Sequence, residues 1–281
     1  MNQGRLIIWL QYLVPQHALS RLVLHATRVR APWFKNWLVR AFLRLYTVDM
    51  TETVETDPLR YGSFNEFFTR ALKPGARPIA PDPSDIVSPV DGLISEAGSI
   101  EGDTLVQAKG RCYSLRELLA ARAWASRFEG GSFATIYLAP FNYHRVHMPL
   151  SGQLEETVYV PGRLFSVNAA TAAFVPRLFA RNERVLTLFD TAFGEFALVL
   201  VGALNVGSIA TVWSGDITPA AKRVVSVLPR QRLALEKGAE LGRFNMGSTV
   251  ILLFEAHRAR WHAGVRAGTS VRLGQSLGTL E

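Results

Sequence analysis

Cysteine is almost absent from this sequence. Its 281 residues contain one cysteine, Cys112, so no disulfide can form within the chain and nothing indicates an oxidising compartment. A single cysteine outside a reactive motif is most often a small buried hydrophobic residue, and we expect Cys112 to be one. A chain of this length can bury a sizeable core without disulfides or metal ions, and it has room for one or two domains.

Long hydrophobic runs are also missing. A membrane-spanning helix needs about 20 mostly apolar residues, whereas the apolar stretch that starts at Leu6 is interrupted at Gln11 and Pro15. No small-residue cleavage site follows it, so we do not expect a secretory signal peptide. The segment from Phe196 to Gly215 carries no charge, but its glycines and its many Val, Ile and Thr residues predict two buried strands joined by a turn.

The motifs of several enzyme classes do not occur. The chain has no G-x-G-x-x-G after a strand and no Walker loop, which argues against a nucleotide-binding βαβ fold. It has no G-x-S-x-G nucleophile elbow of the α/β-hydrolases and no H-E-x-x-H zinc motif.

Acidic residues are scarce at one end of the chain, and the positive charge gathers there. The formal net charge is +8, of which the first 50 residues, with seven basic and one acidic side chain, carry +6. The rest of the chain is nearly neutral, so we expect no nucleic-acid partner, which would need Lys and Arg spread over the folded domain. An anionic membrane surface is the first candidate partner for the basic N-terminus.

Two N-terminal segments have helical periodicity. The first places these apolar residues on one face: Leu19, Leu22, Val23 and Ala26. The second begins at Pro32 and has an aromatic stripe: Trp33, Phe34, Trp37, Leu38, Ala41, Phe42 and Leu45. Such stripes are typical of helices packed on a domain and of helices lying in the headgroup plane of a membrane. The tryptophans and the positive charge favour the membrane, so we assign amphipathic membrane-surface helices and a connector to 1–60 and the main domain to 61–281.

The main domain is predicted to be mostly β-structure. Two short helices are expected, one capped by Ser63 with Glu66 three residues later and one from Ser114 to Ala125. The expected strands are Leu93–Ser95, Phe133–Leu138, Gly152–Val160, Val185–Phe189, Phe196–Leu204, Ser208–Val212 and Val250–Phe254. The predicted fold class is α+β: a mainly antiparallel β domain of sandwich or barrel type, preceded by N-terminal amphipathic helices.

Three local clusters contain residues capable of chemistry. They are Ser88–Gly92, which includes Asp91; Phe141–Pro149, which includes His144 and His147; and Glu240–Val250, which includes Gly247-Ser248-Thr249. Taken alone, each is most simply a turn or a strand end. Together, an Asp, a His and a Ser are the parts of an activated hydroxyl group, in which the Asp orients the imidazole and the imidazole takes the proton.

Ser248 has one electrophile that is always within reach, the carbonyl group of Gly247. Because glycine has no Cβ, we expect residue 247 to allow a close approach to that carbonyl. The pair therefore indicates self-processing rather than hydrolysis of an external substrate.

With these clusters the chain resembles the phosphatidylserine decarboxylase family of the bacterial, proteobacterial type, over essentially its whole length. The motifs that carry the resemblance are Tyr46-x-Val48-Asp49-Met50, Phe64-Asn65-Glu66-Phe67-Phe68, Ser88-Pro89-Val90-Asp91-Gly92, Tyr143-His144-Arg145-Val146-His147-Met148-Pro149, Pro161-Gly162-x-Leu164-Phe165-Ser166-Val167-Asn168, Phe179-Ala180-Arg181-Asn182-Glu183-Arg184 and Gly242-Arg243-Phe244. The family's usual processing signature is Leu-Gly-Ser-Thr, and Met246 stands here in place of the leucine. The two side chains have similar volumes, so we expect processing to survive the exchange.

The resemblance implies a self-processing, pyruvoyl-dependent lyase. In the family, residues at the positions of Asp91, His147 and Ser248 drive cleavage after Gly247, which would give chains 1–247 and 248–281. Ser248 would become the pyruvoyl cofactor, which forms a Schiff base with phosphatidylserine on the way to phosphatidylethanolamine and CO2. His144 is the candidate proton donor and His147 the second choice. No metal is implied.

The resemblance also implies partners and a place in the cell. Besides the phosphatidylserine substrate and an anionic membrane surface, the two cleaved chains would partner each other as a heterodimer, which could dimerise further. The protein would be peripheral, on the cytoplasmic face of the cell membrane.

Two other functions fit part of the pattern. A metal-dependent hydrolase could use His144, His147 and Asp91, and would lose activity to a chelator while its chain stayed intact. A non-enzymatic, membrane-attached β domain, similar to a lipoyl carrier, would need a modifiable lysine at its turn, and Asp91-Gly92 offers none.

Overall fold

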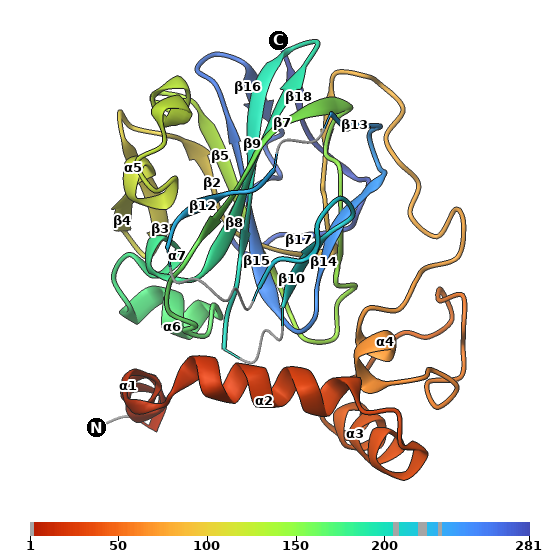
Figure 1. Cartoon of the computed structure of the whole chain (residues 1–281). Coiled ribbons are helices and arrows are strands. Elements are labelled where there is room, and N and C mark those ends of the chain that lie inside the picture. Colours follow the sequence, from red (N-terminus) through yellow and green to blue (C-terminus); the bar gives the residue numbers. More distant parts are fainter. Residues whose placement is uncertain (1–2, 205–207, 219–223, 230–231) are drawn as a thin grey trace.

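The computed structural model describes residues 3–204, 208–218, 224–229 and 232–281, and side chains from Ile8 onward. The N-terminal helices are α1 (Gln3–Leu13), α2 (Gln16–Arg28), α3 (Pro32–Leu45) and α4 (Phe64–Phe68). The main domain carries α5 (Leu115–Leu118), a 3-10 helix, η1 (Ala123–Phe128), α6 (Ala169–Phe174) and α7 (Leu178–Arg181). Helices α1–α3 lie in a row along one end of the sheets (Figure 1).

Antiparallel strands build the main domain, as predicted. The largest sheet has the order β12 (Ser226–Val227), β7 (Gly152–Val160), β8 (Arg184–Thr191), β9 (Gly194–Val201), β15 (Ser248–Phe254), β5 (Ser132–Leu138), β2 (Gly92–Ser99) and β17 (Ser270–Val271), with β13 (Ala234–Leu235) also paired to β7. A second sheet has the order β11 (Gly215–Asp216), β10 (Ile209–Thr211), β14 (Glu240–Phe244) and β6 (Arg145–His147). Smaller groups are β1 (Asp85–Val87), β18 (Ser276–Leu280) and β16 (Ala259–Trp261), and the pair β3 (Thr104–Ala108) and β4 (Arg111–Ser114). Among the described residues the sheets do not close into a barrel.

Strand β15 is the centre of the large sheet. It pairs along its length with β5 on one side and β9 on the other, and all its residues are buried. This explains the uninterrupted apolar run Val250–Phe254 that follows Ser248 and Thr249, because a strand covered on both faces has no solvent-exposed side. The uncharged segment from Phe196 to Gly215 holds β9 and β10, which confirms the prediction of strands.

Helix α2 buries a polar face, contrary to the predicted apolar stripe. Gln16, Ser20, Leu24 and Thr27 are buried, whereas Leu22 is exposed. Gln16 docks the start of α2 to a loop of the main domain by a hydrogen bond, whereas the Ser20 Oγ has no partner among the described residues and Thr27 bonds within the helix. The Oε1 atom of Gln16 accepts from the backbone N–H of Leu164 at 2.8 Å, and Gln11 of α1 accepts in the same way from Ser166 at 2.8 Å.

Helix α3 likewise turns much of its predicted stripe outward. Its buried residues are Lys35, Val39 and Phe42. Trp33, Trp37 and Leu45 of the predicted stripe are exposed, with accessible fractions of 76%, 60% and 77%. Of the seven residues predicted to form one apolar face, only Phe42 is fully buried.

A small second core joins α3 to α4. Its buried members are Val39, Phe42, Phe64, Phe67 and Phe68. Helix α4 begins where it was predicted, because the Ser63 Oγ accepts from the backbone N–H of Glu66 at 3.1 Å.

Two other predictions are wrong. The helix expected from Ser114 to Ala125 starts with the predicted cap but breaks into α5 and η1, because Ala120 and Ala121 have left-handed φ angles of 52° and 54°. Cys112 is exposed on β4 instead of buried, because that strand is paired to β3 alone in a two-stranded sheet.

The described helices include none with the length and apolar character that a crossing of the bilayer requires.

Candidate active site

The end of strand β5 brings Asp91 and Ser248 into one region. Both β2, which begins one residue after Asp91, and β15, which begins at Ser248, run antiparallel to β5 on its two sides. Ser248 pairs directly with Leu138, the last residue of β5. Because neighbouring strands are about 4.8 Å apart, the backbones of Asp91 and Ser248 are separated by roughly two strand spacings.

His147 reaches the same region from the second sheet. It ends β6, and its backbone N–H donates to the carbonyl oxygen of Pro89 at 2.8 Å, two residues before Asp91. Strand β6 pairs with β14, which leads through a short turn into β15 and Ser248. The fold therefore gathers the three segments that carry the predicted site residues.

The hydrogen bonds of His147 define which ring nitrogen is the base. Its Nδ1 lies 2.7 Å from the carbonyl oxygen of Gly238, which only accepts, so Nδ1 carries the proton. Its Nε2 therefore accepts from the hydroxyl group of Tyr143 at 3.0 Å. Burial lowers the pKa of His147, although the charges of Glu240 and Asp91 act to raise it. The imidazole is held neutral, with Nε2 as its basic atom.

Asp91 is bonded to partners other than His147. Its carboxylate accepts from the Arg77 guanidinium, with Nη2 to Oδ2 at 2.7 Å and Nε to Oδ1 at 2.9 Å, and from the backbone N–H of Leu273 at 2.9 Å. Arg77 also pairs with Glu52 at 2.8 Å, and its two carboxylate partners raise its pKa. In this structure Asp91 therefore acts on His147 only through its charge. A direct hydrogen bond between the two would require Asp91 to give up one of its bonds to Arg77 or Leu273.

Ser248 is buried, and its Oγ has no hydrogen-bond partner among the described residues. Directly opposed residues share one face of a sheet, so Ser248 lies on the side of the buried Leu138. A Cβ atom at Gly247 would meet nothing within 4 Å. No residue beyond its two chain neighbours therefore crowds Gly247, and this free space lies beside the bond that the sequence predicts to be cut.

His144 is a second neutral imidazole. Its Nδ1 lies 2.8 Å from the carbonyl oxygen of Asn142, so that nitrogen carries the proton, while the buried Nε2 has no partner among the described residues. Burial lowers the pKa of His144 to about 3. The ring packs on Phe68 of the second core, with centroids 4.2 Å apart. His144 is therefore a proton acceptor before it can be a proton donor.

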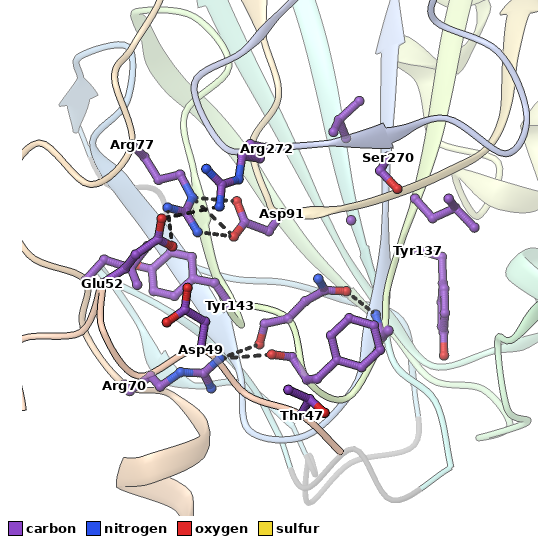
Figure 2. A pocket seen from close by; sticks show the side chains of 17 residues that line it. Thr47, Asp49, Glu52, Arg70, Arg77, Asp91, Tyr137, Tyr143, Ser270 and Arg272 are labelled. Atoms are coloured by element: carbon purple, nitrogen blue, oxygen red, sulfur yellow. Dashed lines mark hydrogen bonds and ion pairs between the residues drawn. The ribbon is translucent and has the colours of Figure 1, made fainter. Parts of the chain in front are cut away.

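A cavity of about 430 Å³ opens beside Asp91 (Figure 2). Its charged lining residues are Asp49, Glu52, Arg70, Arg77, Asp91 and Arg272, and its polar or aromatic lining includes Tyr137, Tyr143 and Ser270. Tyr143 connects the cavity to His147, and burial raises the pKa of Tyr143 to about 12. Ser248 is not among the described lining residues, so the cavity meets the site at Asp91 and Tyr143 and leaves the serine enclosed.

Three contacts of the candidate site residues were not predicted from the sequence. Arg77 lies in a proline-rich loop with no local motif, and Gly238 acts through its carbonyl oxygen, which leaves no trace in a sequence. Tyr143 offered a usable signal, because it lies next to the two histidines in the same motif.

The described residues contain no group of three or more His, Cys, Asp or Glu side chains placed to hold a metal ion. His144 and His147 each bond one ring nitrogen to a backbone carbonyl, and Asp91 bonds to Arg77. In each imidazole Nδ1 therefore carries the proton, and Nε2 is the atom that can accept one.

Comparison with known proteins gives two family matches and many full-length relatives. The family model described as "Phosphatidylserine decarboxylase" matches residues 64–279, and one described as "PSD" matches residues 6–47. Phosphatidylserine decarboxylase proenzymes from Methylococcus capsulatus and Pseudomonas aeruginosa are each 54% identical to the chain; the alignments cover 98% of the chain and 96% and 97% of these relatives. The corresponding proenzyme of Bordetella bronchiseptica is 53% identical, over 98% of the chain and 94% of its own length.

Proposed function

The chain belongs to the phosphatidylserine decarboxylase family, and we propose that Asp91, His147 and Ser248 produce its pyruvoyl cofactor by cleaving the bond between Gly247 and Ser248. The protein is a pyruvoyl-dependent carboxy-lyase that converts phosphatidylserine to phosphatidylethanolamine and CO2. The observation that carries the cleavage proposal is the buried, unpartnered hydroxyl group of Ser248, which directly follows a glycine with free space around it.

In this proposal His147 is the general base. Its Nε2 removes the Ser248 proton while Oγ bonds to the Gly247 carbonyl carbon, and the peptide nitrogen leaves with a proton to give an ester. Loss of the ester by elimination frees chain 1–247, and the dehydroalanine left at 248 takes up water and releases ammonia. Ser248 has to replace Tyr143 at Nε2 for the first step. The charge of Asp91 stabilises the imidazolium that forms.

The surroundings of Ser248 fit a small, uncharged keto group. Residue 248 is fully buried and its side chain has no hydrogen-bond partner to lose. A pyruvoyl group at this position supplies an electron sink for decarboxylation, which no amino-acid side chain provides.

We assign His144 the proton transfers to and from the substrate. The serine headgroup carries an ammonium group that must lose a proton before its nitrogen can react. The Nε2 of His144 has no hydrogen-bond partner among the described residues, and in this proposal it takes the proton once the anionic substrate lies beside the ring and offsets the burial that lowers its pKa. His144 then holds the proton that the α-carbon needs after CO2 has left. His147 is the alternative donor.

The cleaved enzyme is proposed to be a heterodimer of chains 1–247 and 248–281. The cut lies at the first residue of β15, so all later pairings of β15 with β5 and β9 are retained. Strand β18 of the short chain pairs with β1 of the long one. The short chain is therefore expected to stay bound, and further dimerisation of the heterodimer remains part of the proposal.

We further propose that α1–α3 hold the protein on the membrane as a peripheral protein of the cytoplasmic face. These helices expose large apolar side chains to solvent: Trp9, Leu10, Leu13, Leu22, Trp33, Trp37 and Leu45. Exposed basic residues lie among them, including Arg21, Arg40 and Arg44. Aromatic and basic side chains together suit the headgroup region of an anionic bilayer, where the substrate resides. An exposed Cys112 suits a reducing compartment.

The self-cleavage proposal is tested by the intact mass of the purified protein. Wild-type protein should give two chains, 248–281 with a blocked N-terminus and 1–247, and Ser248→Ala should give one inactive chain of full length. The matched control Thr249→Ala keeps the reacting hydroxyl group and should still be cut. A Ser248→Ala protein that still decarboxylates phosphatidylserine would mean that the cofactor comes from elsewhere.

A further inference from the structure

Asn245 is a buried polar residue two positions before the bond that we propose is cut. Its Oδ1 accepts from the Nδ2 of Asn65 in α4 at 3.0 Å. Its Nδ2 donates to the hydroxyl group of Ser208 and to Oδ1 of Asp216 at 3.2 Å, and its backbone N–H donates to the carbonyl oxygen of Ser208. The side chain is thus held from two sides, by α4 and by Ser208, just before β10, together with Asp216 of β11.

The network continues to the N-terminal helices. Asp216 pairs with Arg28, the last residue of α2, at 2.5 Å, and also accepts from Ser208 at 2.8 Å. Asn65 itself belongs to α4, whose phenylalanines form the second core with α3. Asn245 is therefore the point at which two N-terminal helices are bonded to the turn between β14 and β15.

The next residue, Met246, has an unusual backbone. Its φ angle is 134°, in a region that residues with a Cβ rarely adopt. Its side chain packs against the second core, while on the other side of Gly247 the pairing of Ser248 with Leu138 fixes the start of β15. Strain of this kind persists only where the surroundings hold it in place, and the bonds of Asn245 together with the packing of Met246 do so.

We propose that Asn245 is a positioning residue for self-cleavage, which holds the turn so that the Gly247 carbonyl stays in reach of Ser248 and Met246 stays strained. Attack by Ser248 replaces the peptide bond after Gly247 with an ester link through Oγ, which adds atoms to the connection and lets the turn relax, so the strain assists the step. The helices α2 and α4 take part through Arg28 and Asn65. The inference depends on the proposed cut between Gly247 and Ser248.

The sharpest test exchanges the two ends of one hydrogen bond. Asn245→Asp places a carboxylate against Asp216 and should slow the appearance of chain 248–281 by about tenfold or more. Adding Asp216→Asn places an amide donor at position 216 opposite the carboxylate acceptor at position 245, so the double variant should recover most of the wild-type cleavage rate. The Asn245→Asp defect alone should shrink as the pH falls and one of the two carboxylates takes a proton.

A second pair of variants changes residues on the N-terminal side of the network. Asn65→Ala removes the α4 bond to Asn245 and should slow cleavage, whereas Arg30→Ala is the matched control, because Arg30 pairs with Glu66 outside the network. Each substitution is also made together with Ser248→Ala, and circular dichroism of these uncut proteins shows whether they fold. If Asn245→Asp does not fold, the Asn65→Ala and Arg30→Ala rates decide the question.

The possible results separate the two proposals. Slow cleavage in Asn245→Asp and Asn65→Ala, with recovery in the double variant, supports the positioning role. Wild-type rates in folded Asn245→Asp or Asn65→Ala protein, or no recovery in the folded double variant, would overturn it. A wild-type chain that stays uncut, or a Ser248→Ala chain that is cut, would instead refute the proposed cleavage site.

Discussion

His147 is held in the neutral form with no proton on Nε2, as the proposed role of general base requires. Gly238 fixes its proton on Nδ1, Tyr143 donates to Nε2, and burial keeps the ring neutral. A general base acts only when it is unprotonated. Because the pKa of His147 lies below its ordinary value of 6.5, the unprotonated form persists to lower pH than a free histidine would allow.

The rate of self-cleavage should therefore be constant above pH 6.5 and fall only at lower pH, as His147 takes a proton. The measurement is the time course of chain 248–281 after folding of freshly made precursor at each pH. Tyr143→Phe removes the donor that favours the neutral ring, so its inflection should move to higher pH. An inflection above 6.5 in the wild-type protein would contradict the assignment of His147 as a buried base.

At the scale of elements, the second core explains why α3 and α4 belong to the folded unit. Phe42 is buried among the phenylalanines of α4, with ring centroids 5.5–5.9 Å from Phe64, Phe67 and Phe68. Phe42→Ala should lower the free energy of unfolding by about 3–5 kcal/mol, because it leaves a cavity that the neighbours only partly fill. Trp37→Ala, on the exposed side of the same helix, should change it by less than about 0.5 kcal/mol.

Urea unfolding of both variants, made together with Ser248→Ala so that every chain is uncut, measures this difference. If both variants lost the same free energy of unfolding, the face of α3 that carries Trp37 would stabilise the fold as much as the face that carries Phe42, contrary to this prediction.

Sequence reasoning identified elements better than it identified their faces. The buried strands β9 and β15 could be predicted, because a short apolar run bounded by turn residues and rich in β-branched side chains is typical of a strand covered on both faces. The buried face of α2 could not, because Gln16 docks by a hydrogen bond to a backbone group far along the chain. The partner of Asp91 was hidden for the same reason: Arg77 reaches it from a loop with no motif.

Across the whole molecule, the amphipathic helices occupy one end of the fold. Helices α1–α3 line that end of the sheets, and β16 and β18 lie at the far end (Figure 1). The turn between β14 and β15 packs against the helices through Met246 and Asn245. A membrane held at the helical end would therefore lie on the same side of the molecule as the proposed cleavage site.

Binding to vesicles that contain anionic phospholipid should depend on this helical end. The single substitutions Arg40→Gln and Arg44→Gln should each weaken vesicle binding about fivefold at low salt, because a basic residue near an anionic surface contributes about 1 kcal/mol to binding. Trp33→Ala with Trp37→Ala should weaken it at low and high salt alike, because burial of an apolar ring is little affected by ions.

The matched control is Arg260→Gln in β16, whose side chain is 80% exposed at the far end of the molecule. Sedimentation with vesicles, repeated at rising salt, gives all the affinities. If Arg260→Gln weakens binding as much as Arg40→Gln does, the attraction comes from the net charge of the whole protein, and α1–α3 are not its membrane-binding surface. If only the helical variants lose affinity, the charge concentrated in the first 50 residues orients the enzyme on its substrate bilayer.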